Sequence, residues 1–348
     1  MTDFSTRLIE WQQTHGRHDL PWQSTCDPYR IWLSEIMLQQ TQVSTVIPYY
    51  ARFLDRFPDI PALAQAPVET VLELWAGLGY YARARNLHRC AQTLVANHCG
   101  SFPKSAEEIV QLPGIGRSTA AAIAAFAFGQ RAAILDGNVK RVLTRCFGID
   151  GIPGTAQTDR QLWALAQSLL PRTDIEHYTQ GLMDLGASLC ARSKPRCANC
   201  PMTEICVAQQ TGRQTELPAI KLKKARPERH TSMLLLTDRK RVLLERRPPT
   251  GIWGGLLSLP EGSETDAAKL ARRHGAGLQK IEALTSVKHS FTHFHLLIHP
   301  LLCTVTPATG VAAEPGWQWI SFEDIGHAAL AAPIKRLLKK LAPPARVS

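Results

Sequence analysis

The stretch Leu112-Pro-Gly-Ile-Gly116-Arg-Ser-Thr-Ala-Ala-Ala-Ile123 indicates two helices joined by a tight turn. Its two glycines let the backbone turn sharply and approach a partner closely. The helix that follows directs its free N–H groups and the positive end of its dipole toward the turn, where they favour phosphate. A Gly-x-Gly pair alone is more typical of an ordinary helix–helix turn, so the flanking sequence has to decide.

Both flanks of this turn carry helix signals. Ser105-Ala-Glu-Glu108 before it has the spacing of a capping box, in which the first and last side chains satisfy each other's backbone N–H groups. The alanine-rich run 120–128 after it is too short to span a membrane and is typical of a packed helix. In this context the segment resembles a helix-hairpin-helix DNA-binding motif, with Gly114 and Gly116 in the hairpin.

The rest of the chain divides into a helical and a mixed part. Helical periodicity runs through residues 1–208, residues 209–226 are a polar and basic linker, and residues 227–348 alternate short strands with helices. We therefore expect a multidomain protein, all-α and then α+β. The elements expected in the second domain are a hairpin of strands 232–237 and 242–246, a helix 265–274, strands 291–302 and 317–321, and a closing helix 334–341.

The charge of the chain is unevenly distributed. The formal net charge is +11; residues 1–213 carry 20 basic and 18 acidic side chains, whereas residues 214–348 carry 20 and 11. Such an excess suits a polyanionic partner, although it is equally compatible with a merely soluble basic surface. The N-terminus has no apolar signal core and no run is long enough to cross a membrane, so we expect a cytoplasmic protein without membrane contact.

Glu35 is the first candidate catalytic residue. A helix that starts at Asp27-Pro28 places Ile31, Glu35 and Leu38 on one face. A carboxyl group on an apolar stripe is desolvated, which raises its pKa as a general acid requires. A lone glutamate more often reaches solvent from a helix edge. That alternative is weakened because the helix runs into the polar cluster Gln39-Gln40-Thr41-Gln42, which suits contacts with bases.

Asp136 is the second candidate. It follows the apolar run 132–135 and precedes a helix that starts near Val139. Aspartate is a common helix N-cap. Beside a DNA-binding hairpin, the same carboxylate could stabilise a sugar cation, as the second carboxylate does in glycoside hydrolysis. Position alone does not decide between these interpretations.

Four of the nine cysteines are clustered with the spacing Cys190-x6-Cys197-x2-Cys200-x5-Cys206. In a reducing compartment such a cluster indicates a metal site. Structural zinc sites usually pair two short hooks, but only one is present here, which favours a 4Fe-4S cluster and leaves zinc as the alternative. Arg192, Lys194 and Arg196 lie in the first loop of this segment, where they could bind phosphates.

Taken together, these motifs resemble the MutY adenine DNA glycosylases of the endonuclease III superfamily. The matching segments are 20–23 (LPWQ), 34–42 (SEIMLQQTQ), 77–88 (GLGYYARARNLH), 112–118 (LPGIGRS) and 135–141 (LDGNVKR). The cysteine spacing matches the iron–sulfur pattern of that superfamily, with the cluster loop at 190–206. The resemblance implies removal of adenine mispaired with 8-oxoguanine or guanine in double-stranded DNA, by a monomer that extrudes the base from the duplex.

The resemblance also implies a role for individual residues. Glu35 protonates the leaving adenine, Asp136 stabilises the sugar cation, and Asn138 helps to hold both. Further residues have expected binding roles: an adenine pocket of Trp22, Gln23 and Asp184, and DNA or lesion contacts by Gln40, Tyr80, Gly114, Gly116 and Ser118.

The C-terminal region resembles the Nudix-like domain with which MutY proteins recognise 8-oxoguanine. Phe291, Thr292 and His293 stand where the family has Phe-Ser-His. Threonine keeps the hydroxyl but adds a methyl group, so this contact with the lesion is less secure. Residues 261–274 lack the clustered glutamates that bind a divalent cation, which predicts binding without hydrolysis.

Three rival functions were weighed against this one. A bifunctional endonuclease III-type enzyme needs a lysine amine where this chain has Ser118, although Lys140 keeps a weak lyase activity conceivable. A non-catalytic DNA-binding module would have no need of both Glu35 and Asp136. A nucleotide-pyrophosphate hydrolase lacks its glutamates.

Overall fold

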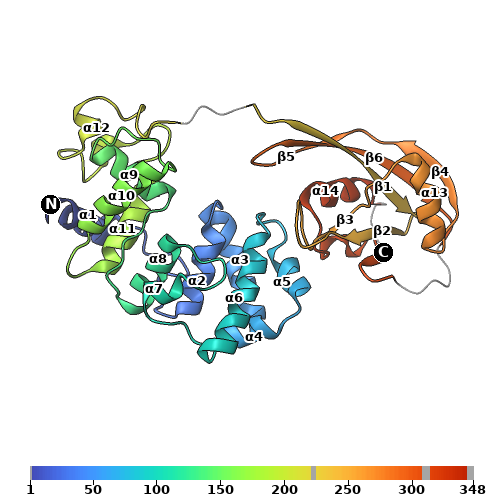
Figure 1. Cartoon of the computed structure of the whole chain (residues 1–348), viewed down its shortest axis with the longest axis horizontal. Coiled ribbons are helices and arrows are strands. Elements are labelled where there is room, and N and C mark those ends of the chain that lie inside the picture. The colour runs from blue at the N-terminus through green and yellow to red at the C-terminus, as the bar shows by residue number, and fades with distance from the viewer. Residues whose placement is uncertain (1, 221–224, 308–313, 343–348) are drawn as a thin grey trace. The chain divides into compact units, whose positions relative to one another are not determined.

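The computed structural model describes residues 2–220, 225–307 and 314–342. The chain forms two compact units, one of residues 1–65 with 86–223 and the other of residues 66–85 with 224–348. The first is helical and the second is built on a sheet (Figure 1). None of the described helices is long and apolar enough to cross a membrane.

Two helices of the first unit begin where the sequence signals predict. Asp27 caps the helix that starts at Pro28, accepting a hydrogen bond from the Tyr29 N–H at 2.9 Å, and the hydroxyl of Ser105 accepts one from the Glu108 N–H. Within this unit lie α1 (Thr2–His15), α2 (Pro28–Leu38), α3 (Val43–Arg56), α4 (Ile60–Gln65), most of α6 (Ala82–His98), α7 (Ala106–Ile109), α8 (Arg117–Phe128), α9 (Gly137–Cys146), α10 (Ala156–Ser168), α11 (Ile175–Ser188), the 3-10 turn η1 (Cys197–Asn199) and α12 (Val207–Gln210).

Part of the expected linker is folded against the helical unit. Leu217 is buried in its core, and the Nε of Arg145 donates a hydrogen bond to the Leu217 carbonyl at 2.8 Å. One apolar side chain in a polar stretch was enough to anchor the segment, because its burial removes apolar surface from water. Residues 221–224 of that linker lie outside the described residues. The exact domain limits 208 and 226 stay a prediction.

The second unit contains a mixed sheet, in which the described strands run β3-β2-β1-β6-β4, with β5 beside β6 and β7 beside β2. The neighbours β1 and β6 are parallel and the other pairs are antiparallel. The elements are α5 (Val68–Trp75), β1 (Glu228–Thr237), β2 (Arg241–Arg246), β3 (Leu257–Ser258), α13 (Glu264–Arg273), β4 (Leu278–Ala283), β5 (Val287–Ser290), β6 (His295–Val305), β7 (Trp317–Ser321), η2 (Asp324–Gly326) and α14 (Ala332–Leu341).

Most expected elements of this unit are present. The β1–β2 hairpin, α13, β7 and α14 coincide with their predictions to within two residues, apart from the longer N-terminal end of β1. The expected strand 291–302 was wrong at its start, because β6 begins at His295. The Phe291 N–H donates to the Phe294 carbonyl at 2.9 Å across a two-residue turn, and this turn reverses the chain between β5 and β6.

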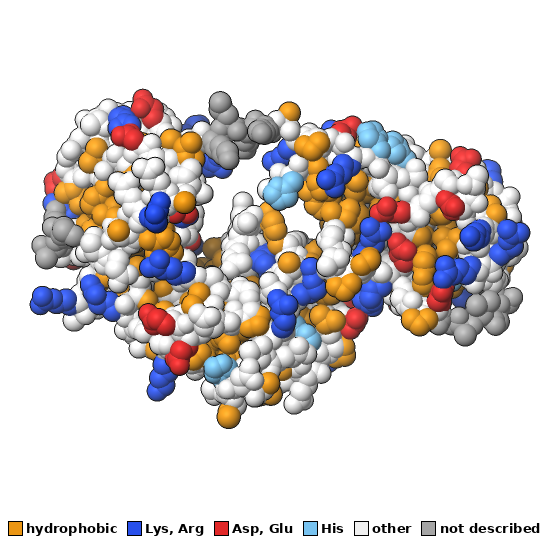
Figure 2. Space-filling model, in the orientation of Figure 1, with side chains coloured by type: hydrophobic (Ala, Val, Ile, Leu, Met, Phe, Trp, Pro, Cys, Tyr) orange, Lys and Arg blue, Asp and Glu red, His pale blue; other side chains and the backbone are white. Residues whose placement is uncertain are grey.

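On the face of the second unit that Figure 2 shows, positive charge is not gathered into one patch. On the face shown in Figure 2, its Lys and Arg side chains alternate with Asp and Glu. Several are held in ion pairs, such as Arg247 between Glu245 and Glu261 and Arg241 beside Asp238. Part of the excess positive charge of this unit is thus paired with carboxylates.

Candidate active site

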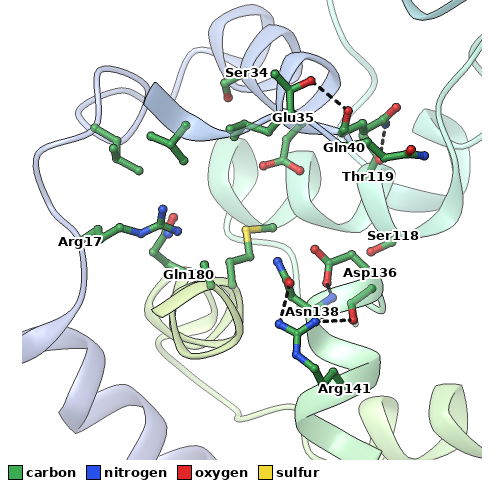
Figure 3. Close-up of a pocket in the computed structure, with 18 of the residues that line it drawn as sticks. Arg17, Ser34, Glu35, Gln40, Ser118, Thr119, Asp136, Asn138, Arg141 and Gln180 are labelled. Carbon is green, nitrogen blue, oxygen red and sulfur yellow. Dashed lines mark hydrogen bonds between the residues drawn. The ribbon is translucent and has the colours of Figure 1, made fainter. Parts of the chain in front are cut away.

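The helical unit contains an open cavity of about 1370 Å³. Its walls come from the segment before α2, from α2 itself, from the N-terminal turns of α8 and α9, and from α11 (Figure 3). Seven of the residues predicted to have a functional role line it: Trp22, Gln23, Glu35, Gln40, Ser118, Asp136 and Asn138. Segments separated by more than 150 residues in sequence, such as those that carry Arg17 and Gln180, thus meet in one place.

Glu35 projects into this cavity from α2, between Ile31 and Leu38, which also line it. Part of its surface is accessible from the cavity, yet protein surrounds the carboxyl group closely enough that desolvation raises its pKa to about 8. The nearby negative charge of Asp136 raises the pKa further. A pKa of about 8 keeps the Glu35 carboxyl group largely protonated at neutral pH.

Asp136 faces the same cavity from the N-terminus of α9 (Figure 3). Its Oδ1 accepts hydrogen bonds from the backbone N–H groups of Asn138 and Val139, both at 2.8 Å. Asp136 is thus the N-cap of α9 and a cavity carboxylate at once, so the two interpretations do not exclude each other. The Ser118 hydroxyl accepts a hydrogen bond from the Leu135 N–H at 2.9 Å and so fixes the segment that carries Asp136.

Asn138 is held by Arg141, one turn further along α9 (Figure 3). The Arg141 Nη2 donates to the Asn138 Oδ1 at 2.9 Å and to the Gly186 carbonyl at 2.7 Å, and its Nε donates to the Cys190 carbonyl at 2.8 Å. A Cβ atom on Gly186 would lie 2.7 Å from the Asn138 Cβ, so the close approach of α11 and α9 requires glycine there. Arg141 therefore ties α9, which carries Asn138, to the start of the cysteine loop.

The predicted adenine-pocket residues take different places. Trp22 is buried at the cavity wall, with its ring edge-on to Tyr50. Gln23 lines the cavity, but its amide accepts from the Leu20 N–H and donates to the Arg17 carbonyl, which holds the loop before α2. Asp184 is 1% exposed and is not among the lining residues.

Asp184 is instead bound by two cavity residues that the sequence did not single out. The Arg17 guanidinium contacts its Oδ1 at 2.6 Å, and the Gln180 Nε2 donates to the same oxygen at 2.8 Å. Arg17 and Gln180 themselves line the cavity (Figure 3). No local motif marks either residue, since Arg17 meets Asp184 only after the chain has folded back on itself.

Comparison with known proteins agrees with this site. Residues 33–168 match the HhH-GPD superfamily of base excision DNA repair proteins, and residues 231–340 match the NUDIX domain. The adenine DNA glycosylase of Buchnera aphidicola subsp. Baizongia pistaciae is 36% identical over 340 residues, which cover 97% of this chain and 96% of that protein. The chain belongs to the adenine DNA glycosylase family. The sequence resemblance is thereby confirmed, and the chain is an enzyme of the DNA glycosylase class.

A second adenine DNA glycosylase supports the assignment, and two solved structures share the fold of the helical part. The adenine DNA glycosylase of Homo sapiens is 32% identical over 408 residues, covering 97% of this chain and 74% of that protein. A thermostable thymine-DNA glycosylase superposes with a TM-score of 0.54 at 30% identity, covering 60% of this chain and 95% of that one. An endonuclease III–DNA complex, at a TM-score of 0.51 and 21% identity over 61% and 98% of the two chains, shares the fold of the helical part.

The hairpin of this adenine DNA glycosylase family member has the geometry its glycines predicted. Gly114 has a φ of +77°, and a Cβ there would lie 2.5 Å from the Asn86 Cβ, so a side chain is excluded. Gly116 is the N-cap residue of α8 and leaves the first N–H groups of that helix without a side-chain cap. Arg117 next to it stacks on the Trp163 ring, 3.8 Å from its centroid.

Two further residues with predicted DNA contacts sit on strained backbone. Gln40 lines the cavity just after α2 with a φ of 57°, and Tyr80 has a φ of 49° with half of its surface exposed. A positive φ is unfavourable for both residue types. Tyr80 belongs to the second unit, so the cavity in the first unit does not include it.

The three predicted lesion residues lie at the turn between β5 and β6. Thr292 and His293 are exposed at its tip. Phe291 is partly buried, stacks on Phe294 with ring centroids 4.8 Å apart, and contacts Trp253 at 5.6 Å. The turn therefore carries polar side chains at its tip and packed aromatic rings beneath them.

The four clustered cysteines line one small cavity between α9, α11 and the loop that follows. Among the described residues, no three His, Cys, Asp or Glu side chains converge closely enough to bind a single metal ion. Arg145, buried beside them, donates to the carbonyls of Ala191 and Arg192 and places its Nη1 3.4 Å from the Cys190 Sγ. The cysteine loop is thus fastened to α9 from two sides, by Arg141 and Arg145.

Proposed function

We propose that this enzyme removes adenine mispaired with 8-oxoguanine or guanine by acid-catalysed hydrolysis. The single observation that carries the proposal is the pair of Glu35 and Asp136 on one cavity, the first with its pKa raised to about 8 and the second held by backbone N–H groups. One carboxyl group is suited to donate a proton and the other to remain negative. A buried carboxyl group with a raised pKa beside a second carboxyl group is the arrangement expected of a general acid and its partner.

Each residue then has one step. Glu35 donates its proton to a ring nitrogen of the extruded adenine, which makes the base a better leaving group. As the glycosidic bond breaks, positive charge develops on the sugar, and the Asp136 carboxylate stabilises it. Asn138, fixed by Arg141, holds the first turn of α9 and with it Asp136. Water then adds to the sugar and leaves an abasic site.

Strand cleavage is not part of this proposal. Lys140 forms an ion pair with Asp159 at 2.6 Å and does not line the cavity, and no other described lysine lines it. Ser118 is engaged by the Leu135 N–H. A Schiff-base route therefore lacks a placed amine.

The decisive experiment incubates the protein with duplexes that hold adenine opposite 8-oxoguanine, opposite guanine, or opposite thymine, and with a duplex that holds an oxidised pyrimidine. We expect abasic product with the first two, visible as a strand break only after alkali treatment. The Lys140→Met variant should behave as the wild type. Strand breaks without alkali would contradict the hydrolytic mechanism, and cleavage at oxidised pyrimidines alone would favour the endonuclease III-type rival.

We infer further that the β5–β6 turn recognises the lesion. Thr292 and His293 offer exposed hydrogen-bonding groups on a base of packed rings, an arrangement that suits contact with a purine and its extra oxygen. His293→Ala should lower the rate ratio between the 8-oxoguanine and guanine duplexes by about tenfold. His327→Ala, another exposed histidine of the same unit, is the matched control.

Phe291→Ala tests the aromatic base of the turn separately. We expect the same loss of preference together with a lower melting temperature, because Phe291 packs on Phe294 and His289. A lower melting temperature with an unchanged preference for 8-oxoguanine over guanine would show that Phe291 only packs the domain.

We also propose that Cys190, Cys197, Cys200 and Cys206 bind a 4Fe-4S cluster. All four thiols line one cavity without converging on a point. This arrangement fits a cluster, in which each iron takes one cysteine, better than a tetrahedral zinc ion. When bound, the cluster would cross-link the loop that carries Arg192 and Arg196.

Iron analysis tests this assignment. Freshly prepared, anaerobically handled protein should contain iron and absorb broadly in the visible range, and Cys197→Ser should lose both together with DNA affinity. Cys99→Ser, at an exposed cysteine outside the cysteine loop and outside both cavities, should leave them unchanged. Zinc in place of iron would contradict the cluster.

A further inference from the structure

A fifth cysteine adjoins the proposed cluster site. Cys146 is the last residue of α9, is 4% exposed, and lines the same small cavity as the four clustered cysteines. Its thiol lies within hydrogen-bond reach of the Cys206 thiol. The sequence indicated only a small core residue, since 44 residues separate Cys146 from Cys190.

Core packing alone does not explain this position. Cys146 does belong to the core of the helical unit, but among the described residues it is the one unclustered cysteine that lines the cysteine cavity. Cys90 in α6 is also buried, but it does not line this cavity. The placement therefore brings a thiol to the site, not merely a small apolar side chain.

The surroundings of Cys206 create a need for a donor. Its Sγ lies 3.6 Å from the Arg145 carbonyl oxygen, which can accept a hydrogen bond but cannot donate one. As an iron ligand, Cys206 is a thiolate and becomes an acceptor itself. The Arg145 carbonyl oxygen then cannot form a hydrogen bond with the Cys206 sulfur, because both are acceptors, whereas the S–H group of Cys146 can donate one to it. The Arg145 Nη1 likewise donates a hydrogen bond to the sulfur of Cys190.

We propose that Cys146 is not a ligand but a hydrogen-bond donor to the coordinating sulfur of Cys206, through which it raises the reduction potential of the cluster. The proposal rests on the cluster proposed above. Adding an electron increases the negative charge on the ligand sulfurs, so a donor at one of them stabilises the reduced form more than the oxidised form. The adjacent residues Arg145 and Cys146, at the end of the helix that Asp136 begins, would thus serve two of the four sulfurs.

The test compares full-length wild type with Cys146→Ala, Cys146→Ser and the matched control Cys90→Ala. Iron content is measured first, then the midpoint potential at an electrode and the Fe–S(Cys) stretching frequencies by resonance Raman spectroscopy. We expect full iron content in all four proteins. Cys146→Ala should shift the reduction equilibrium about tenfold toward the oxidised form, which is 59 mV for one electron, and should raise a stretching frequency. Cys146→Ser keeps a donor and should stay close to the wild type, as should Cys90→Ala.

Each other outcome overturns the inference in a distinguishable way. Unchanged potential and frequencies in Cys146→Ala, with iron present, would overturn the hydrogen bond alone. Loss of iron from Cys146→Ala but not from Cys90→Ala would show that Cys146 is a ligand or an indispensable part of the site. Wild-type protein without iron would overturn this inference and the cluster together.

Discussion

Glu35→Gln is expected to reduce adenine release by at least about 10³-fold while DNA affinity stays within a few-fold of the wild type. Glutamine keeps the shape of the side chain but has no proton to give. Asp136→Asn should cause a loss of similar size, because asparagine removes the negative charge that stabilises the sugar cation. Asparagine is as good an N-cap as aspartate, so α9 should remain intact. The measurement is the single-turnover rate on a duplex with adenine opposite 8-oxoguanine.

Glu10→Gln, at an exposed glutamate on α1, is the control for these two variants.

Melting curves provide a second check, and the expected direction of the change in melting temperature follows from the pKa of Glu35. Its value of about 8 in the folded protein lies above the ordinary 4.5, so the fold loses stability as pH rises from about 4.5 through 8. At pH 9 the Gln variant should therefore melt at the wild-type temperature or above it. After solvent screening is taken into account, its free energy of unfolding should exceed that of the wild type by ~2 kcal/mol at most. A near-normal rate in either catalytic variant would mean that the wrong residue has been identified.

The wild-type rate should also depend on pH in a defined way. Catalysis requires the protonated Glu35, whose pKa is raised to about 8 by burial and by Asp136. Single-turnover rates should thus be level near pH 7 and fall about tenfold per pH unit above pH 8. In Asp136→Asn, the residual activity should begin to fall at a lower pH than the wild-type activity does, because one cause of the raised pKa of Glu35 is gone. A rate that rises through pH 8 would exclude Glu35 as the acid.

Asp184→Asn is expected to destabilise the helical unit by about 3 kcal/mol and to lower its melting temperature by roughly 6–10 °C. The substitution leaves the Arg17 guanidinium without its buried partner, which is the costly part of breaking an ion pair. Asp159→Asn is the matched control, since its ion pair with Lys140 is more exposed and should contribute less than about 1 kcal/mol.

This substitution also separates two roles for Asp184. If it mainly supports Arg17 and Gln180, the rate loss should follow the loss of folded protein and be recovered at low temperature. A large rate loss with an unchanged melting temperature would place Asp184 in direct contact with adenine, as the family resemblance implied.

The sequence by itself determined those features that depend on a few neighbouring residues. The turn at Gly114, the helix start at Asp27 and the β1–β2 hairpin all occur where they were predicted, and Asp136 caps α9, which was one of the two interpretations of that residue. Each is set by local backbone geometry and short-range hydrogen bonds, which a sequence pattern records directly. The apolar stripe around Glu35 belongs to the same class, because helical periodicity fixes which residues share a face.

Only the tertiary structure decided which distant residues meet. Arg17 pairs with Asp184, Arg141 links Asn138 to the Cys190 carbonyl, and Cys146 joins the cysteine cavity. No spacing rule connects such partners, since their contact depends on how helices pack and not on distance along the chain. Leu217 belongs to this class too, because its side chain is buried in the core of the helical unit. The turn at Phe291 is different, because its contact with Phe294 is local and the sequence pattern nevertheless did not reveal it. The pKa of Glu35 is likewise a property of the assembled cavity, because desolvation requires walls that only the fold supplies.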